Sequence, residues 1–462
     1  MNDLNSLFSR RRMLQTTSVG FGWLAFRAMA TQALASQQNP LAPKEPHFAP
    51  RAKRVIFLFM RGAPSHVDTF DYKPLLKRDT GKVGKGRRGE KLLGSLWDFE
   101  KYGQSGQRIS ELFPAVGKHA DDLCILNGMA TDIPNHPQAV VQMHTGNFQF
   151  VRPSLGAWTL YGLGTENKNL PGFVTLAPSS GAGGARNYGS SFLPAIYQGT
   201  PIGKERRGGR GGGNDAKLPN MENPQLSKKT QRLQLDLIQS MNQQQLLRDK
   251  FNPEVEGIIE SFELAFRMQS ELPKVMDISS EPSHIRNMYG LDDGTTRAFG
   301  TQCLLARRMV ERGVRFVELS HGNWDQHRNL ETALTNNCDQ TDVPIAALLQ
   351  DLKQRDLLKD TLVIWGGEFG RTPHAQNGNG RDHNSKGFSM WMAGGGVKGG
   401  MTHGATDQYG YEAAVDKMHI HDWHATILHL LGLDHERLTY NYAGRDFRLT
   451  DVHGNVARDI LA

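Results

Sequence analysis

Three short blocks in the C-terminal third of the chain combine side-chain types that hold metal ions in proteins. Asp325 and His327 lie two positions apart in one loop, and Glu368 follows an apolar run after two glycines. Asp382 and His383 precede a further apolar run. Carboxylate and imidazole donors together suit a borderline cation such as zinc or manganese. Because open α/β sheets carry their chemistry at the carboxyl ends of the strands, we expect these blocks to meet there.

Similar side chains follow the first two apolar runs of the chain. His66 and Asp68 come just after the first run, where they suit metal ligation or substrate orientation. The alternative for them is a turn that caps a helix. His136 follows the second run and suits a ligand, a general base or a nucleophile, or else a hydrogen-bonded structural histidine. The histidine-rich residues 419–424 are expected to be mainly structural, with Asp422 as the N-cap of a helix.

Two arginines lie next to these blocks. Arg61 ends the first apolar run, and Arg371 follows Glu368 by three positions. The guanidinium fork matches the geometry of a phosphate or sulfate group. We therefore expect Arg371 or Arg61 to hold an anion, while His136 moves a proton.

Six nearly continuous apolar runs mark the elements that must position these side chains. They are residues 54–60, 123–126, 172–176, 314–319, 361–365 and 388–393. Such runs are typical of strands that are buried on both faces of a parallel sheet. Helical patterns over residues 343–354 and 423–431 lie between or after them. The alternation predicts an α/β domain with a mostly parallel central sheet flanked by helices.

The first 35 residues carry the pattern of an exported protein. Arg10-Arg11-Arg12 precedes a weakly apolar run, and Ala33-Leu34-Ala35 offers a small-residue cleavage site. The pattern predicts a twin-arginine signal peptide over residues 1–35 and a periplasmic or cell-surface location. No stretch approaches the roughly 18 apolar residues of a membrane span.

The remainder of the chain divides into a linker and one domain. Residues 36–52 are rich in Pro, Gln and Ala and are predicted to be a linker. Residues 53–462 form the α/β domain, in which about 180–300 are a glycine-rich loop and long amide-rich helices. This insertion is either a cap on the side of the sheet or a lid over the site. The net charge of +7 is modest, and no basic and aromatic stripe predicts binding of nucleic acid.

Several motifs together resemble one family of exported bacterial proteins. They are the run from Arg54 to Lys73, the run Gly366-Gly367-Glu368-Phe369-Gly370-Arg371-Thr372-Pro373, and the tail from His419 through Gly444-Arg445-Asp446 to Gly454. The family is that of domain of unknown function 1501, which is regarded as sulfatase-like within the alkaline phosphatase superfamily. The resemblance covers nearly all of the chain after the signal. It implies a parallel-rich sheet with a metal site at the strand ends.

The resemblance implies ligands for one half of a two-metal site. His383 fits the metal-binding histidine that precedes a late strand in members similar to cofactor-independent phosphoglycerate mutase. Asp325 with His327 resembles their Asp and Gly-His ligands at a shorter spacing. Glu368-Phe369 stands where sulfatases have an Asp-His or Asp-Asn pair, so one ligand type is kept and one is lost. The implied cofactor is one divalent metal (zinc, manganese or calcium) on Asp325, His327 and His383.

The nucleophile is the largest departure from the family pattern. Sulfatases carry Cys or Ser ten residues before the Gly of a Thr-Gly pair, and counting back from Gly146 reaches His136. A histidine is neither a precursor of formylglycine nor the hydroxyl nucleophile of a phosphatase. The resemblance therefore implies that His136 works by another route, or that the covalent step is lost.

The sequence thus predicts an exported hydrolase-like protein that uses a metal to cleave a sulfate or phosphate ester of a small molecule or glycan. The expected catalytic residues are His136, Glu368 and Arg371, and the expected substrate-binding residues are Arg61, His66 and Asp68. The alternative is a non-catalytic periplasmic or surface receptor for sulfated or phosphorylated glycans, which the missing nucleophile favours. A structural envelope protein is a third option that no motif supports.

Overall fold

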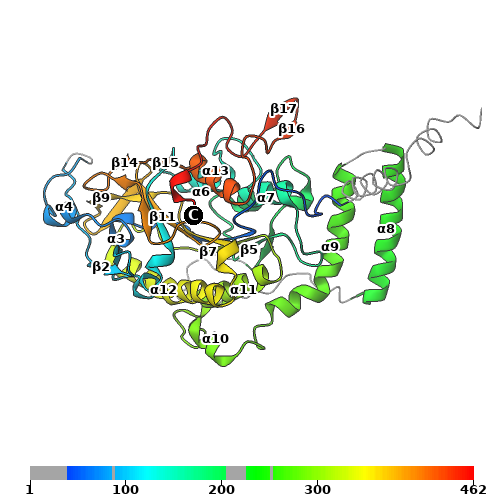
Figure 1. Ribbon diagram of the computed structural model, residues 1–462, viewed down its shortest axis with the longest axis horizontal. Coiled ribbons are helices and arrows are strands. Elements are labelled where there is room, and N and C mark those ends of the chain that lie inside the picture. The colour runs from blue at the N-terminus through cyan, green and yellow to red at the C-terminus, as the bar shows by residue number, and fades with distance from the viewer. Residues whose placement is uncertain (1–38, 86–88, 204–224, 250–252) are drawn as a thin grey trace, which may run out of the picture.

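The computed structural model describes residues 39–85, 89–203, 225–249 and 253–462 (Figure 1). The central sheet of this part has nine strands in the order β12-β4-β11-β8-β1-β7-β5-β6, with β15 paired to β4 outside that path. The predicted signal peptide, residues 1–35, lies outside the described residues, and its role in export stays a prediction.

The strands of the central sheet are short and mostly buried. They are β1 (Arg54–Met60), β4 (Leu123–Ala130), β5 (Phe173–Leu176), β6 (Thr200–Ile202), β7 (Phe316–His321), β8 (Thr361–Gly366), β11 (Phe388–Ala393), β12 (Met401–His403) and β15 (Met418–His419). Every pairing is parallel except those of β11, which runs antiparallel to β4 and β8. The predicted mostly parallel sheet is therefore confirmed, and all six apolar runs are strands. β6, β12 and β15 have only two or three residues, too few to form an apolar run.

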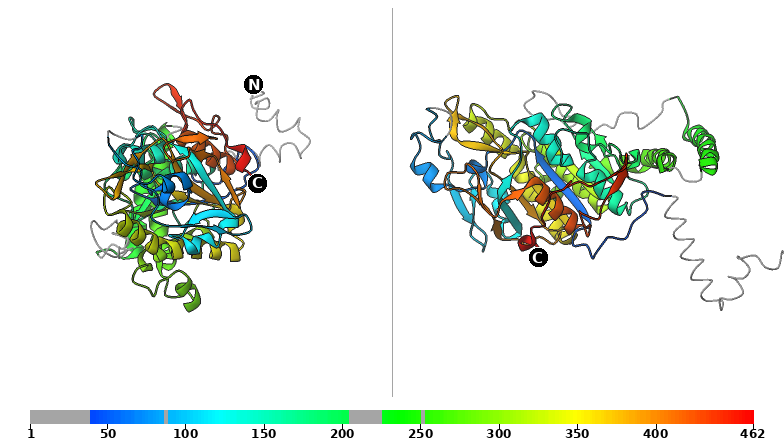
Figure 2. Two further views of the ribbon diagram at one scale, coloured as in Figure 1. Left: turned by 90° about the vertical axis from the view of Figure 1, so that its left-hand side faces the viewer. Right: turned by 90° about the horizontal axis from the view of Figure 1, so that it is seen from above.

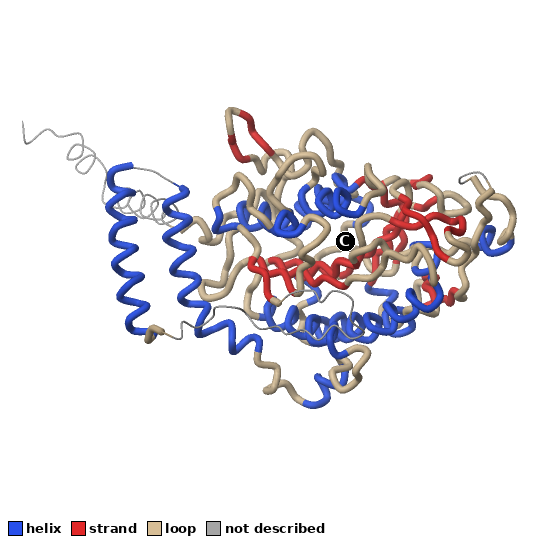
Figure 3. The backbone as a smooth tube through the Cα atoms, turned by 180° about the vertical axis from the view of Figure 1, so that it is seen from behind, coloured by secondary structure: helices blue, strands red, loops and turns tan. Residues whose placement is uncertain are grey.

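Helices cover both faces of the sheet (Figure 3). One face packs against α5 (Pro114–Gly117), α11 (Arg297–Glu311) and α12 (Leu330–Gln354), and the other against α6 (His136–Thr145), α7 (Leu155–Leu163) and α13 (Ile420–Leu430). Along β1 the even-numbered side chains from Ile56 to Met60 join the first core, and the odd-numbered ones from Val55 to Phe59 join the second. Since successive side chains of a strand point to opposite faces, burial on both faces produces an unbroken apolar run.

Two helices begin earlier than their sequence pattern predicts. α12 begins at Leu330 rather than at residue 343, because its first turns are rich in Thr, Asn and Asp, which weaken a helical pattern. The N-cap of α13 is His419 and not Asp422. The His419 side chain accepts a hydrogen bond from the backbone N–H of His421, and the Asp422 carboxylate accepts one from that of His419. Asp422 therefore belongs to a reciprocal capping box.

Two helices of the predicted insertion form a hairpin at one end of the molecule. α8 (Lys228–Asp249) and α9 (Pro253–Met276) lie side by side, at the end opposite β9 (Gly370–Gln376) in both Figure 1 and Figure 2. The hairpin extends the molecule sideways and does not lie over the strand ends near β9, as a lid would. No helix within the described ranges, these two included, is long and apolar enough to cross a membrane.

The described part of the predicted linker, residues 39–52, is attached to the domain by backbone hydrogen bonds. Thr165 N–H donates to Leu41 O at 2.9 Å, and the N–H groups of Arg51 and Ala52 donate to Leu430 O at 2.8 and 2.9 Å. Leu41 and Ala52 are buried. This segment therefore packs on α7 and α13 and is not a free tether.

A two-stranded hairpin outside the central sheet carries parts of two predicted blocks. β9 and β10 (Gly380–Asn384) are antiparallel. Asn377 and Gly378 at the turn have φ of 50° and 85°. A positive φ at both positions is what an Asn-Gly turn in a hairpin adopts. The strands are too polar for an apolar pattern to reveal them, whereas the Asn-Gly pair is a signal for the turn.

A buried salt bridge joins this hairpin to α3 (His66–Thr69). Arg381 donates from Nε to Asp68 Oδ2 at 2.7 Å and from Nη2 to Asp68 Oδ1 at 3.0 Å. Both side chains are 0% exposed, and the Ser65 hydroxyl donates to the same carboxylate. Asp68 therefore faces no substrate, which corrects its predicted role in substrate binding.

Replacing Asp68 by alanine leaves the Arg381 guanidinium buried without its charge partner. We expect Asp68→Ala to lower the free energy of unfolding by about 3–5 kcal/mol, measured by denaturant titration. The double variant Asp68→Leu with Arg381→Met removes both charges, so it should recover part of that loss. If Asp68→Ala were as stable as the parent, the salt bridge would not hold the hairpin.

Candidate metal centre

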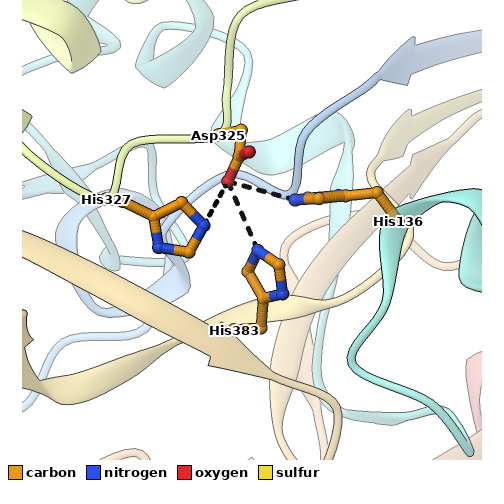
Figure 4. A group of neighbouring side chains, drawn as sticks. All are labelled: His136, Asp325, His327 and His383. Carbon is orange, nitrogen blue, oxygen red and sulfur yellow. Dashed lines mark hydrogen bonds and ion pairs between the residues drawn. The ribbon is translucent and has the colours of Figure 1, made fainter. Parts of the chain in front are cut away.

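Four side chains from distant parts of the sequence converge beside the central sheet (Figure 4). His136 begins α6, Asp325 and His327 lie between β7 and α12, and His383 lies on β10. One ligand atom from each lies within 4.8 Å of the others. The three predicted metal ligands therefore meet, and His136, which was expected in a catalytic role, joins them.

The three imidazoles direct the same ring nitrogen toward one carboxylate oxygen. The Nε2 atoms of His327, His136 and His383 lie 2.9, 3.1 and 3.3 Å from Asp325 Oδ1. The contact of His136 does not have hydrogen-bond geometry, so its buried Nε2 has no hydrogen-bond partner among the described residues. A buried polar atom normally has a hydrogen-bond or metal partner. Three imidazoles and one carboxylate are a donor set that fits a divalent metal.

The other ring nitrogen of each histidine is held by an acceptor. The acceptors are Glu368 Oε1 for His136 (2.6 Å), the Pro134 carbonyl for His383 (2.8 Å) and Gln376 Oε1 for His327. An acceptor at Nδ1 keeps the proton on that nitrogen and leaves the Nε2 lone pair available to a metal. The surroundings of the cluster thus select the tautomer in which three lone pairs converge.

Arg371 holds Asp325 from the interior of the protein. Its Nη2 donates to Asp325 Oδ1 at 2.7 Å, and its Nε donates to the Ala63 carbonyl at 3.0 Å. The same Nη2 also lies 3.3 Å from Trp324 O. The Arg371 side chain is 1% exposed, so it cannot reach an anion in solvent. Arg371 therefore positions a ligand, which differs from its predicted role as the clamp of a substrate anion.

Glu368 lies behind His136 and is also fully buried. Its carboxylate accepts hydrogen bonds from Gly62 N–H at 3.0 and 3.2 Å and pairs with His136 Nδ1. Gly62 has a φ of 109°, and a Cβ at this position would lie 2.6 Å from Asp325 N, so only glycine fits. Glu368 thus orients His136 from behind, and we describe it as a positioning residue rather than the catalytic residue of our prediction.

The predicted substrate-binding residues occupy two different environments. His66 is buried, with Nε2 donating to Gly410 O at 3.0 Å and Nδ1 accepting from the Arg371 N–H at 3.4 Å. Burial lowers the pKa of His66 below its ordinary value. His66, like Asp68, therefore supports the β9–β10 hairpin and is not placed to touch a substrate. Arg61, at the end of β1, is half-buried.

Residues 52–461 match the family described as "Protein of unknown function (DUF1501)". The chain belongs to the DUF1501 family. No curated protein matches it in sequence.

Several solved structures resemble the DUF1501 chain weakly. An alkaline phosphatase superfamily protein from Vibrio parahaemolyticus has a TM-score of 0.36 at 9% identity, over 86% of this chain and 70% of that one. The lipoteichoic acid synthase LtaP from Listeria monocytogenes has 0.35 at 9%, over 90% and 79%. The PsFucS1 sulfatase from Pseudoalteromonas sp. has 0.34 at 12%, over 84% and 69%. Scores this low say nothing about the chemistry of the site.

The four clustered side chains of the DUF1501 chain take their hydrogen bonds from groups other than hydroxyls and thiols in the part of the chain that the structure describes. Within the described ranges, no Ser, Thr or Cys side chain hydrogen-bonds to any of the four ligand side chains. Cys124, Cys303 and Cys338 are free and buried. The position that the family pattern assigns to the nucleophile is occupied by His136, which lies between Glu368 and Asp325.

Three residues that complete the centre could hardly be identified from the sequence. Pro134 contributes only its carbonyl, which no side-chain pattern reveals. Gln376 comes directly before the Asn-Gly turn, so the turn signal locates the strand that carries it. The Phe369 ring lies 4.7 Å from the His136 ring and 4.8 Å from the His383 ring, and it forms an apolar wall beside the ligands.

The carboxylates of the cluster favour a protonated His136 when no ion is bound. Burial lowers the pKa of His136, but the nearby carboxylates of Asp325 and Glu368 outweigh burial and leave the pKa raised. Burial also raises the pKa of Asp325, yet its close contacts with His136 and His383 and the charge of Arg371 bring it well below its ordinary value. A metal and these protons compete for the same nitrogens.

The raised pKa of His136 predicts how the stability of metal-free protein depends on pH. The stabilisation from protonated His136 is present below the unfolded pKa of about 6.5 and is lost as the pH rises through the higher folded pKa. We therefore expect the free energy of unfolding of chelator-treated protein to fall as the pH is raised from about 6.5. The variant His136→Asn keeps a donor for Glu368 but does not titrate, so it should flatten this decline. Denaturant titrations of both proteins across this range make the comparison, and identical pH profiles would contradict it.

Proposed function

We propose that this DUF1501 protein is a metal-dependent hydrolase of phosphate or sulfate esters. Its single divalent ion is held by His136, Asp325, His327 and His383. The observation that carries the proposal is that each imidazole has an acceptor at Nδ1 and directs Nε2 to one point. Three nitrogens and one carboxylate suit zinc or manganese, whereas calcium prefers a shell of oxygen ligands.

The residues around the ion orient its ligands or bind the substrate anion. A divalent ion in this position supplies Lewis-acid polarisation of an ester oxygen. Glu368 and Arg371 fix the directions of His136 and Asp325, and burial of both supports this role. We assign the binding of the substrate anion to Arg61, because it is partly exposed while Arg371 is not.

Direct attack by water accounts for the reaction without a nucleophile from the protein. The water oxygen bonds to phosphorus or sulfur while the bond to the alcohol oxygen breaks. The alcohol leaves with one proton from the water. No covalent intermediate is needed, which agrees with the lack of hydroxyl and thiol contacts to the ligands in the described ranges.

The buried pair of His136 and Glu368 offers a test with a matched control. Glu368→Gln weakens the acceptor that orients His136, so we expect the affinity for zinc to fall about 10–100-fold. The control is Glu318→Gln, because Glu318 lies 3.2 Å from Nε2 of His144, a second buried histidine of α6 outside the centre. Competition with a chromogenic chelator measures both affinities. An equal loss in both variants would show that burial, and not ligand orientation, is responsible.

Turnover of ester substrates tests the proposed reaction. Zinc- and manganese-loaded protein should hydrolyse aryl phosphate or aryl sulfate esters, and single-turnover hydrolysis in ¹⁸O-water should place one labelled oxygen in the released anion. His383→Ala removes one of four ligands and should abolish both metal retention and turnover. Metal binding without turnover would favour the second candidate, a receptor for anionic glycans, to which the missing nucleophile also points. Protein that binds no metal would overturn the proposed function.

A further inference from the structure

A polar cavity lies between the β4–α6 loop, the start of α13 and the C-terminal segment. Its volume is about 560 Å³. Its charged and imidazole lining residues are Asp132, His419, His421, Asp422, Glu436 and His453. None of the four ligands of the metal centre belongs to the described lining, so the cavity is a separate site.

One short loop connects the cavity with the metal centre. The Pro134 carbonyl accepts a hydrogen bond from His383 Nδ1 at 2.8 Å, whereas Asp132, two residues earlier, lines the cavity. Two residues span at most about 7 Å. The cavity therefore borders the loop that supports the metal centre.

His421 is a buried polar side chain of the cavity lining with a ring nitrogen that is available to a ligand. It is 7% exposed, and its Nε2 lies 2.8 Å from the Gly146 carbonyl, so Nε2 carries a proton. No described residue hydrogen-bonds to its Nδ1, although His421 lines the cavity. Burial lowers the pKa of His421, so the ring is neutral and its Nδ1 is an unused acceptor. The ring is held by His453, which stacks on it with centroids 4.9 Å apart.

Two carboxylates of the lining are fixed in their orientation. Asp132 Oδ1 lies 3.3 Å from His419 Nε2, and Asp132 Oδ2 accepts a hydrogen bond from Gln142. The close imidazole of His419, with the hydrogen bond from Gln142, lowers the pKa of Asp132 to about 2. Asp422 accepts from the N–H groups of His419 at 2.9 Å and Asn455 at 2.7 Å. Both side chains thus present negative charge without having to reorganise when a ligand binds.

We propose that this cavity binds a protonated amine with neighbouring hydroxyl groups, as found on an amino sugar or an amino alcohol. Acceptors dominate the described lining, which contains no Lys or Arg. An ammonium group offers three donors and a positive charge to such acceptors, whereas a sulfate or phosphate would be repelled. That this amine belongs to the ester substrate rests on the proposed function. The binding of an amine in the cavity is independent of that function.

Binding of glucosamine to chelator-treated, full-length protein tests the cavity without using the metal centre. Calorimetric titrations at neutral pH compare glucosamine with N-acetylglucosamine, which keeps the ring but has no charge. We expect glucosamine to bind at least about tenfold more tightly, a difference of about 1.4 kcal/mol. Ethanolamine distinguishes the two sources of the amine. If it binds as tightly as glucosamine, the ligand is an amino alcohol, and if it binds more weakly, the ligand is an amino sugar.

Variants of the lining locate the binding site. Asp132→Asn and Glu436→Gln should each weaken glucosamine binding by about tenfold, while Glu318→Gln should not change it. Glu436 is mostly exposed (66%) and pairs with Arg448 at 3.4 Å, so its variant tests the cavity with little risk to folding. Equal affinity for the charged and uncharged sugars, or an affinity that neither lining variant changes, would overturn the proposal.

The two proposals fail separately. His383→Ala should lose the metal and keep its affinity for glucosamine, because His383 does not line the cavity. Protein that binds glucosamine as expected but retains no metal would contradict the proposed function and leave the amine site standing. Protein that binds metal and hydrolyses esters but does not prefer glucosamine would contradict the amine site and leave the proposed function standing.

Discussion

Three imidazoles can bind one ion only when each directs an unprotonated ring nitrogen at it, and here the acceptors behind the rings leave Nε2 as that nitrogen in all three. Glu368 follows β8, and the Pro134 carbonyl follows β4. Gln376 is the last residue of β9. These segments meet because the sheet and its neighbouring hairpin bring their ends together. The metal centre thus depends on the alignment of three separate elements, as is typical of sites whose outer partners orient the ligands.

The β9–β10 hairpin is the second requirement, since it places His383 against the loop that carries Asp325 and His327. At Gly380, on this hairpin, an added Cβ would lie 2.1 Å from the backbone carbonyl carbon of His327, so the two segments are in direct contact. Buried arginines hold this arrangement. Arg381 joins the hairpin to α3, and Arg371 joins it to Asp325. A buried ion pair adds little stability over apolar packing, but removing one partner is costly, so such pairs are effective at keeping a single geometry.

The sequence predicts the sheet and the convergence of Asp325, His327 and His383 better than it predicts the surroundings of the polar residues nearby. Unbroken apolar runs identify the buried strands, and the position of Asp325, His327 and His383 near strand ends follows from them. His66, Asp68 and Arg371 have the same chemical types as functional residues, yet all three are buried and bonded within the protein. Arg371 belongs to the polar β9–β10 hairpin, and His66 and Asp68 are buried against it. Apolar patterning does not reveal such a hairpin. His136 was expected to act on the substrate because it occupies a nucleophile position, and the sequence did not indicate its contacts with Glu368 and Asp325.

X-ray absorption spectroscopy of the zinc-loaded, full-length protein tests the central claim most directly, because it identifies the atoms that bind the ion. The account predicts three imidazole nitrogens and one carboxylate oxygen at about 2.0–2.2 Å. It also predicts that His136→Asn reduces the imidazole count to two. A shell made of oxygen atoms alone, or an imidazole count that His136→Asn leaves unchanged, would contradict it.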